Sequence, residues 1–336
     1  MSEPPFVSYA QNGEDVVLWR ALQHVPGGRW VDVGANHPET DSVTKAFYDR
    51  GWTGLDVEPV AGFARLLREA RPNDIVVEAA VCREDGGEVV LHEFVGTGLS
   101  TLRDEYVAEP VEQGRTLRET RVPSRRLQSL VDEHLGGEPV HFLKVDVEGA
   151  EAEVLASVDL RSWRPWVLVV ESTRPNSTET TQTEWEPAVL EAGYQFCLFD
   201  GLSRFYVADE HAGELASALS YPACVLDHAE RAAVLRTAAA LHGLQEAHHQ
   251  TVTELSRTNK RLDSITGLEA EVATLRGELV RWRGVVLERW AAAAGNQPRF
   301  VDRDAQAELT AMRQTLSWRV TRPLRAVRAR QRGSFA

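Results

Sequence analysis

The sequence has few cysteines, no long apolar run and no cluster of basic residues before its far C-terminus. Its three cysteines, Cys82, Cys197 and Cys224, are widely spaced, so neither a zinc motif nor a disulfide framework is predicted. No window reaches the roughly 18 apolar residues of a membrane span. The N-terminus also lacks the cationic and apolar regions of a secretion signal. We therefore expect a cytoplasmic protein in a reducing compartment.

The charge of the chain is strongly negative. Its formal net charge is -13 over 336 residues. A surface that binds phosphates needs clustered cations, so the charge argues against a general nucleic-acid binder and no nucleic-acid partner is expected. The length suits one sizeable core and an appendage.

Short apolar runs alternate with helical patterns over the first two thirds of the chain. The apolar runs cover residues 30–33, 53–57, 75–81, 140–147 and 166–170. The helical patterns between them include residues 14–22, 44–49, 61–70 and 150–158. Continuous apolar strands joined by helical crossovers are typical of a parallel sheet that is covered on both faces. The sequence therefore predicts an α/β domain.

Two further segments complete this domain. Asp200 and Gly201 separate two β-rich runs, which predicts a tight antiparallel hairpin at the end of the sheet. Residues 87–94 read as an inserted strand, and residues 96–123 as a long polar loop near the substrate site. We place the domain at residues 1–225.

A helical segment without strand signals follows, at residues 226–312. Its apolar residues recur three and four apart and change phase near Gly267. They are Val252, Leu255, Leu262, Ile265, Leu268, Val272, Leu275, Leu279, Trp282 and Val286. Heptad spacing predicts a coiled coil, in which Asn259 fixes the register and the chain forms a homo-oligomer. Packing of the helix on its own domain is the alternative.

The last segment, residues 313–336, is basic and partly amphipathic. Its arginines are closely spaced and interleave with apolar residues: Arg319, Arg322, Arg325, Arg328, Arg330 and Arg332. Such a tail suits docking on an anionic membrane surface, here the inner face, or on an assembly partner. A solvated tail is the alternative.

The first strand of the sheet ends in a turn with polar residues. Gly34 permits a sharp turn against a ligand, and Asp32 and Asn36 offer hydrogen bonds at the edge where open parallel sheets bind ligands. A dinucleotide fingerprint needs G-x-G-x-x-G, which this turn lacks. Pyrophosphate binding is therefore disfavoured, although an ordinary strand-to-helix turn remains the alternative.

A carboxylate follows the second strand. Glu58 is placed to accept both hydroxyls of a ribose, with about 1.5–3 kcal/mol for each charge-assisted bond. The two motifs together suggest a nucleoside ligand without a pyrophosphate, which describes S-adenosylmethionine.

Several stretches carry a family resemblance. "DVGAN", "VEP" and "LKVDVEGAEAEVL" resemble the FkbM family of S-adenosylmethionine-dependent methyltransferases. "SYAQNGEDVVLWRAL", "GLSTL" and "DGLSRFYV" resemble a branch of it that is associated with glycan or polysaccharide assembly. The resemblance implies the class I methyltransferase fold, a Rossmann-like, mostly parallel sheet. One departure is Pro38, where the family commonly has glycine.

The resemblance also implies the cofactor contacts. It assigns Asp32, Gly34 and Asn36 to the methionine and sulfonium end, Glu58 to the ribose, and Ala80 and Val81 to the walls beside adenine. For Ala80 and Val81, plain core packing is the alternative.

The stretch "LKVDVEGAEAEVL" offers candidates for catalysis. Asp146, Glu148 and Glu171 all fall at predicted strand ends on the ligand side. One of them can take the proton of an acceptor hydroxyl, or Asp146 and Glu148 can hold a divalent cation such as Mg²⁺ that lowers the pKa of the hydroxyl. Helix capping is the alternative for Glu148.

The sequence thus favours an S-adenosylmethionine-dependent O-methyltransferase that acts on a sugar hydroxyl of a glycan, polysaccharide or glycosylated metabolite. Oxygen and sugar follow from the resemblance. The alternatives are an NAD- or nucleotide-sugar-dependent oxidoreductase on a Rossmann sheet, and a non-catalytic scaffold with a methyltransferase-like domain.

Overall fold

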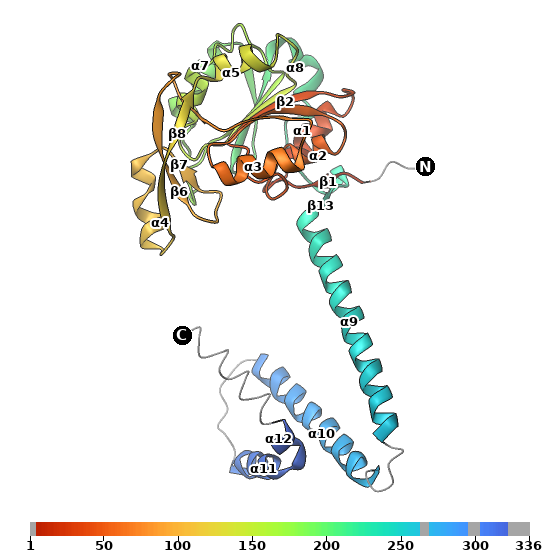
Figure 1. The fold of residues 1–336 in the computed structure, drawn as a ribbon. Helices are drawn as coiled ribbons and strands as arrows, with labels where there is room; N and C mark the ends of the chain where they lie inside the picture. Colours follow the sequence, from red (N-terminus) through yellow and green to blue (C-terminus); the bar gives the residue numbers. More distant parts are fainter. Residues whose placement is uncertain (1–4, 263–268, 295–302, 322–336) are drawn as a thin grey trace. The chain divides into compact units, whose positions relative to one another are not determined.

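The structure is a computed structural model of the chain, and it describes residues 5–262, 269–294 and 303–321. Two compact units divide the chain, Met1–Ala240 and Leu241–Ala336. All described strands belong to the first unit, and the described part of the second is helical (Figure 1). The predicted order, an α/β fold followed by a helical extension, is confirmed.

A seven-stranded sheet forms the centre of the first unit. In spatial order its strands are β11 (Tyr194–Phe199), β12 (Ser203–Ala208), β10 (Val167–Glu171), β9 (Phe142–Val145), β2 (Arg29–Val33), β3 (Thr53–Val57) and β4 (Ile75–Val77). β12 is antiparallel to both of its neighbours, and the other pairs are parallel. This is the predicted class I methyltransferase sheet with its C-terminal hairpin.

Helices cover both faces of this sheet. They are α1 (Glu14–Leu22), α2 (Lys45–Tyr48), α3 (Ala61–Ala70), α5 (Leu127–His134), α6 (Glu151–Ala156), α7 (Glu186–Glu191) and α8 (Asp209–Leu215). Successive strand residues point to opposite faces, so Val31 packs with α5, α6 and α7 while Trp30 packs with α1, α2 and α8. Burial on both faces explains why the strands read as continuous apolar runs.

The expectation of a long loop over residues 96–123 is wrong. These residues supply β7 (Ser100–Thr101), α4 (Ala108–Glu112) and most of β8 (Leu117–Arg125). With β5 (Ala80–Val81) and β6 (Glu88–Phe94) the strands form a second sheet in the order β5-β8-β6-β7, and β6 is the predicted inserted strand (Figure 1). β8 has mostly exposed polar residues, so its apolar pattern is too weak to show in the sequence.

The predicted hairpin turn joins β11 to β12. A carboxylate oxygen of Asp200 accepts the backbone N–H groups of Leu202 and Ser203, at 2.9 and 2.8 Å, and Gly201 has a φ of 104°. The N-terminal segment docks here, because the side-chain amide of Asn12 donates to the carbonyl of Asp200 at 3.0 Å. The turn therefore anchors the segment that leads into α1.

A two-stranded sheet, β1 (Val7–Ser8) with β13 (Glu230–Arg231), comes before four described helices. They are α9 (Ala232–Leu262), α10 (Glu269–Ala294), α11 (Arg303–Gln314) and α12 (Leu316–Val320). Ile265, Gly267 and the arginines from Arg322 onward lie outside the described residues. Among the described helices, none is both long and apolar enough to cross a membrane. Self-association through this segment and docking by the tail stay predictions.

Glu14 gives the fold a pH dependence. Burial and the nearby charge of Asp200 raise the pKa of Glu14 to about 7, from 4.5. An acid with a raised pKa stabilises the fold below its unfolded pKa, and this contribution is lost as the pH rises through 7. Relative to Glu14→Gln, the wild type should lose about 3 kcal/mol of unfolding free energy between pH 4.5 and 8. Urea unfolding across this range measures the difference, and curves that stay parallel would contradict it.

Candidate active site

A pocket of about 510 Å³ lies at the C-terminal ends of β2, β3, β9 and β10. The chain order reverses here, since β3 and β4 lie on one side of β2 and β9 and β10 on the other. Loops that leave neighbouring parallel strands diverge at such a point and leave a crevice. Of the residues that the sequence assigned to the site, every one except Asp32 lines this pocket.

The turn after β2 depends on Gly34. Its φ is 83°, and a Cβ atom at this position would lie 1.8 Å from the carbonyl oxygen of Asp146. Its backbone N–H donates to the carbonyl of Val57 at 2.9 Å. Asn36 also has a positive φ, of 53°. The turn therefore packs tightly between β3 and β9, and glycine is the residue that fits.

Glu58 ties the turn after β2 to the loop before α3. The side chain is 4% exposed, and its two oxygens accept the backbone N–H groups of Asn36 at 2.8 Å and of Val60 at 2.7 Å. Burial raises the pKa of Glu58 to about 7, although both N–H groups lower it. A carboxylate has about four acceptor sites, so capacity for hydroxyl donors remains.

The part of the pocket near β5 is apolar. Ala80 and Val81 line it, as the resemblance implied, and they are also buried core residues. Val60, Phe63 and Leu91 add to the same lining, and sequence reasoning missed them. Phe63 belongs to the pattern of α3 and Leu91 to the inserted strand, so neither carries a local signal of a binding role.

Asp32 lies behind the pocket wall and is 1% exposed. The parallel register pairs it with Lys144 of β9, whose Nζ lies 3.3 Å from the Asp32 carboxylate. The hydroxyl of Thr44 donates to the other oxygen of Asp32 at 3.2 Å. In this structure Asp32 acts on the turn through Lys144, which donates to the carbonyl of Gly34 at 3.1 Å.

Lys144 links this buried pair to the pocket. Its Nζ also lies 3.3 Å from a carboxylate oxygen of Asp146. Burial alone would lower the pKa of Lys144, but Asp146 and Asp32 outweigh burial and raise it above its ordinary value. Lys144 therefore stays protonated and compensates two carboxylates at once.

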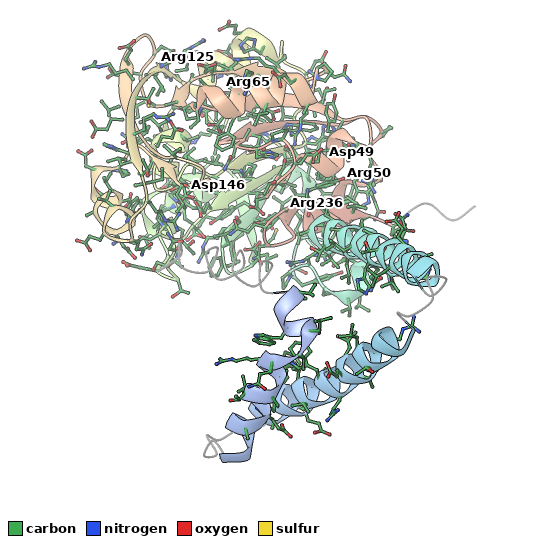
Figure 2. The ribbon with its side chains drawn as sticks, turned by 60° about the horizontal axis from the view of Figure 1, so that its bottom comes forward. Asp49, Arg50, Arg65, Arg125, Asp146 and Arg236 are labelled. Atoms are coloured by element: carbon green, nitrogen blue, oxygen red, sulfur yellow. The ribbon has the colours of Figure 1, made fainter. Side chains whose placement is uncertain are left out.

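The three carboxylates that the sequence placed at strand ends come together. Asp146, Glu148 and Glu171 each offer an oxygen, and these oxygens lie within 4.8 Å of one another. Burial, and then the charges of Asp146 and Glu151, raise the pKa of Glu148 to about 8. Burial and the neighbouring carboxylates likewise raise the pKa of Glu171 well above its usual range. Asp146 is labelled in Figure 2, where it lies among the strands of the α/β unit.

The second sheet holds the loop that carries Glu148. The hydroxyl of Thr101 donates to the carbonyl of Glu148 at 2.7 Å, and Nε of Arg103 donates to the carbonyl of Gly149 at 3.0 Å. Residues 98–100, together with Leu102, line the pocket.

Other loops close the pocket. Gln11 lines it from the N-terminal segment. The loop after β10 contributes Thr173, Arg174, Pro175, Asn176, Ser177 and Thr178, which sequence reasoning missed. His37 lies outside the lining, and its Nδ1 accepts the backbone N–H groups of Glu39 and Thr40 at 3.0 Å. Its ring therefore stabilises its own loop.

Gly34→Ala should destabilise the protein severely. The new Cβ meets a backbone carbonyl, and the positive φ is strained for alanine, so we expect a loss of at least about 3 kcal/mol in unfolding free energy. Gly62→Ala in α3 is the matched control, because nothing lies within 4 Å of its Cβ position. The control should gain up to about 1 kcal/mol. Denaturant unfolding compares the two, and a mild effect at Gly34 would show that the turn can relax.

Comparisons with known proteins add a family match. Residues 32–196 match the family model described as the methyltransferase FkbM domain. No curated protein matches the chain significantly.

Several solved structures align with part of the chain. They include a TehB-like S-adenosylmethionine-dependent methyltransferase from Corynebacterium glutamicum (8% identity, 59% of this chain and 88% of that one, TM-score 0.34), precorrin-6y C5,15-methyltransferase from Geobacter metallireducens (12%, 57% and 84%, 0.32) and Aeropyrum pernix fibrillarin with bound S-adenosyl-L-methionine (12%, 58% and 76%, 0.32). The matched residues of the methyltransferase FkbM domain include every residue that lines the pocket except Gln11 and Leu202.

Proposed function

We propose that the protein is an S-adenosylmethionine-dependent O-methyltransferase whose acceptor is a hydroxyl of a sugar in a glycan, polysaccharide or glycosylated metabolite. The observation that carries this proposal is the pocket itself. A tight glycine turn, a buried glutamate and a carboxylate cluster line it together, and the matched methyltransferase FkbM domain contains all of them.

The cofactor half of the pocket runs from β5 to β2. The apolar lining around Phe63, Ala80 and Val81 suits the adenine ring, and Glu58 suits the ribose hydroxyls. The methionine end then lies near Gly34 and Asn36. This order agrees with the assignment that the family resemblance implied.

The carboxylate cluster suits activation of the acceptor. In methyl transfer the acceptor oxygen forms a bond to the methyl carbon while the sulfur–methyl bond breaks, and the electron pair of that bond stays on the thioether. Holding both reactants in line supplies about 7–11 kcal/mol of the barrier. The hydroxyl proton must also leave, and a positioned base contributes about 10²–10⁴-fold. Asp146, Glu148 and Glu171 lie on the pocket wall where such a group is needed.

The loop after β10 suits a sugar. Its lining residues 173–178 contribute hydroxyl, amide and guanidinium groups on the same side as Glu171. A carbohydrate presents many hydroxyls and needs such donors and acceptors for orientation. The polar loop therefore supports a glycan acceptor over an apolar one.

Calorimetry with S-adenosylmethionine and with NAD tests the class of enzyme. The wild type should bind S-adenosylmethionine and not NAD, because the turn after β2 lacks the second and third glycines of a pyrophosphate site. Binding of NAD alone would favour the oxidoreductase, and binding of neither would favour the scaffold.

The affinity for S-adenosylmethionine should depend on the ionisation of Glu58. Because the pKa of Glu58 is about 7 and an ionised carboxylate accepts hydroxyl hydrogen bonds more strongly, the affinity should rise with pH through 7. Below pH 7 the Kd should weaken by up to about tenfold per pH unit. Titrations at pH 6, 7 and 8 measure this. Glu58→Gln should bind more weakly at pH 8 and show no such dependence, so equal slopes would remove Glu58 from the ribose site.

Asp146→Asn should abolish turnover while cofactor affinity changes little. The variant keeps the shape of the side chain but removes a charge beside Lys144 and the acceptor. Transfer of labelled methyl to a panel of sugar acceptors measures turnover, and calorimetry measures affinity. Undiminished turnover would exclude Asp146 from the mechanism.

A further inference from the structure

The geometry of the carboxylate cluster is that of a cation's ligand sphere. Two oxygens on opposite sides of a cation lie at most twice the metal–oxygen distance apart, which is about 4.2 Å for Mg²⁺ and about 4.6–5.2 Å for Ca²⁺. The cluster oxygens of Asp146, Glu148 and Glu171 lie within 4.8 Å of one another. One cation can therefore reach all three after small side-chain shifts.

An independent feature, the hydrogen bonding of Glu171, points to a ligand. Glu171 is 7% exposed and lines the pocket, and its Oε2 has no hydrogen-bond partner among the described residues. Oε2 of Glu148 is buried without a partner as well. A buried carboxylate oxygen without a partner is costly, and a cation between the two side chains would satisfy both.

The charge of the site also fits a dication. Asp146, Glu148 and Glu171 carry three formal negative charges when ionised, and Glu151 adds another nearby. Lys144 divides its charge between Asp146 and Asp32. The charge of Arg115 lowers the pKa of Glu148, but no ion pair joins the two among the described residues. A dication would leave the cluster of three with one net negative charge.

The backbone that presents Glu148 is fixed from both sides. Thr101 and Arg103 bind the carbonyls of Glu148 and Gly149, and a carboxylate oxygen of Glu151 accepts the N–H of Gly149 at 3.0 Å. Glu148 itself has a φ of 53°, which few residues adopt without such support. Ligands held in advance in this way lose little freedom when a cation binds.

We propose that Asp146, Glu148 and Glu171 form a site for one oxygen-preferring divalent cation, Mg²⁺, Mn²⁺ or Ca²⁺, on the acceptor side of the pocket. Its place in catalysis rests on the proposed methyl transfer, because a bound cation lowers the pKa of a hydroxyl that coordinates it. The cation site itself does not depend on that function. Mutual protonation of the carboxylates is the competing explanation for their close approach.

Mn²⁺ binding to the full chain, without S-adenosylmethionine, tests the site. Electron paramagnetic resonance of free Mn²⁺ and calorimetry should show one strong site in the wild type. Asp146→Asn and Glu171→Gln should each weaken it by at least about tenfold. Glu153→Gln is the matched control, because Glu153 is a partly exposed acid of α6 outside the pocket lining, and it should bind as the wild type does.

Thermal unfolding separates loss of the site from loss of the fold. Glu171→Gln removes a charge from a repulsive cluster and breaks no ion pair among the described residues, so without metal it should melt no lower than the wild type. Asp146→Asn also loses the ion pair with Lys144, so it should melt lower. Mn²⁺ should raise the Tm of the wild type and of Glu153→Gln but not of the two cluster variants.

The proposal is overturned if millimolar Mn²⁺ does not bind, or if all four proteins bind it equally. If Mn²⁺ binds and S-adenosylmethionine does not, methyl transfer is refuted and the cation site stands. If S-adenosylmethionine binds and Mn²⁺ does not, the cation site alone is refuted.

Discussion

A buried ammonium group between two carboxylates holds the centre of this site together. Lys144 contacts Asp32 on the hidden side and Asp146 on the pocket side, and it also binds the turn at Gly34. Removing one member of a buried ion pair leaves the other charge uncompensated, at a cost of about 3–5 kcal/mol. The turn, the pocket wall and the cluster therefore depend on one side chain.

The register of the sheet determines this arrangement. Parallel pairing places Lys144 beside Asp32 and Asp32 beside Asp56, so three charged residues form a row across β9, β2 and β3. One carboxylate oxygen of Asp56 accepts the indole N–H of Trp30 at 2.9 Å, and the other lies 3.7 Å from the guanidinium of Arg71 as an ion pair. A shift of one residue in any strand would turn these charges toward the opposite face. The polar row thus makes other registers unfavourable.

Much of the fold could be predicted because its signals are local. The predicted helices 14–22 and 61–70 coincide with α1 and α3, and the strands follow from continuous apolar runs. The clustering of Asp146, Glu148 and Glu171 could also be predicted from the sequence, because the carboxyl ends of parallel strands meet at one edge of the sheet. β8 could not be predicted from its own sequence, because it lacks an apolar pattern and is stabilised by pairing with β6. The sequence predicts that Asp32 contacts the cofactor, but Asp32 lies behind the pocket wall. Alternation along a strand shows which face a residue lies on, and it does not show that Lys144 of the neighbouring strand pairs with Asp32 there.

The second sheet forms one wall of the pocket and also supports the loop that carries Glu148. It is inserted between β4 and β9, and it supplies Leu91 and Ser100 to the lining while Thr101 braces the Glu148 loop. None of its strands pairs with the seven-stranded sheet among the described residues. Replacement of side chains on β6 and β7 can therefore reshape this wall without disturbing the hydrogen bonds of the central sheet. The insertion gives the protein a pocket wall whose side chains can change during evolution while the core stays unchanged.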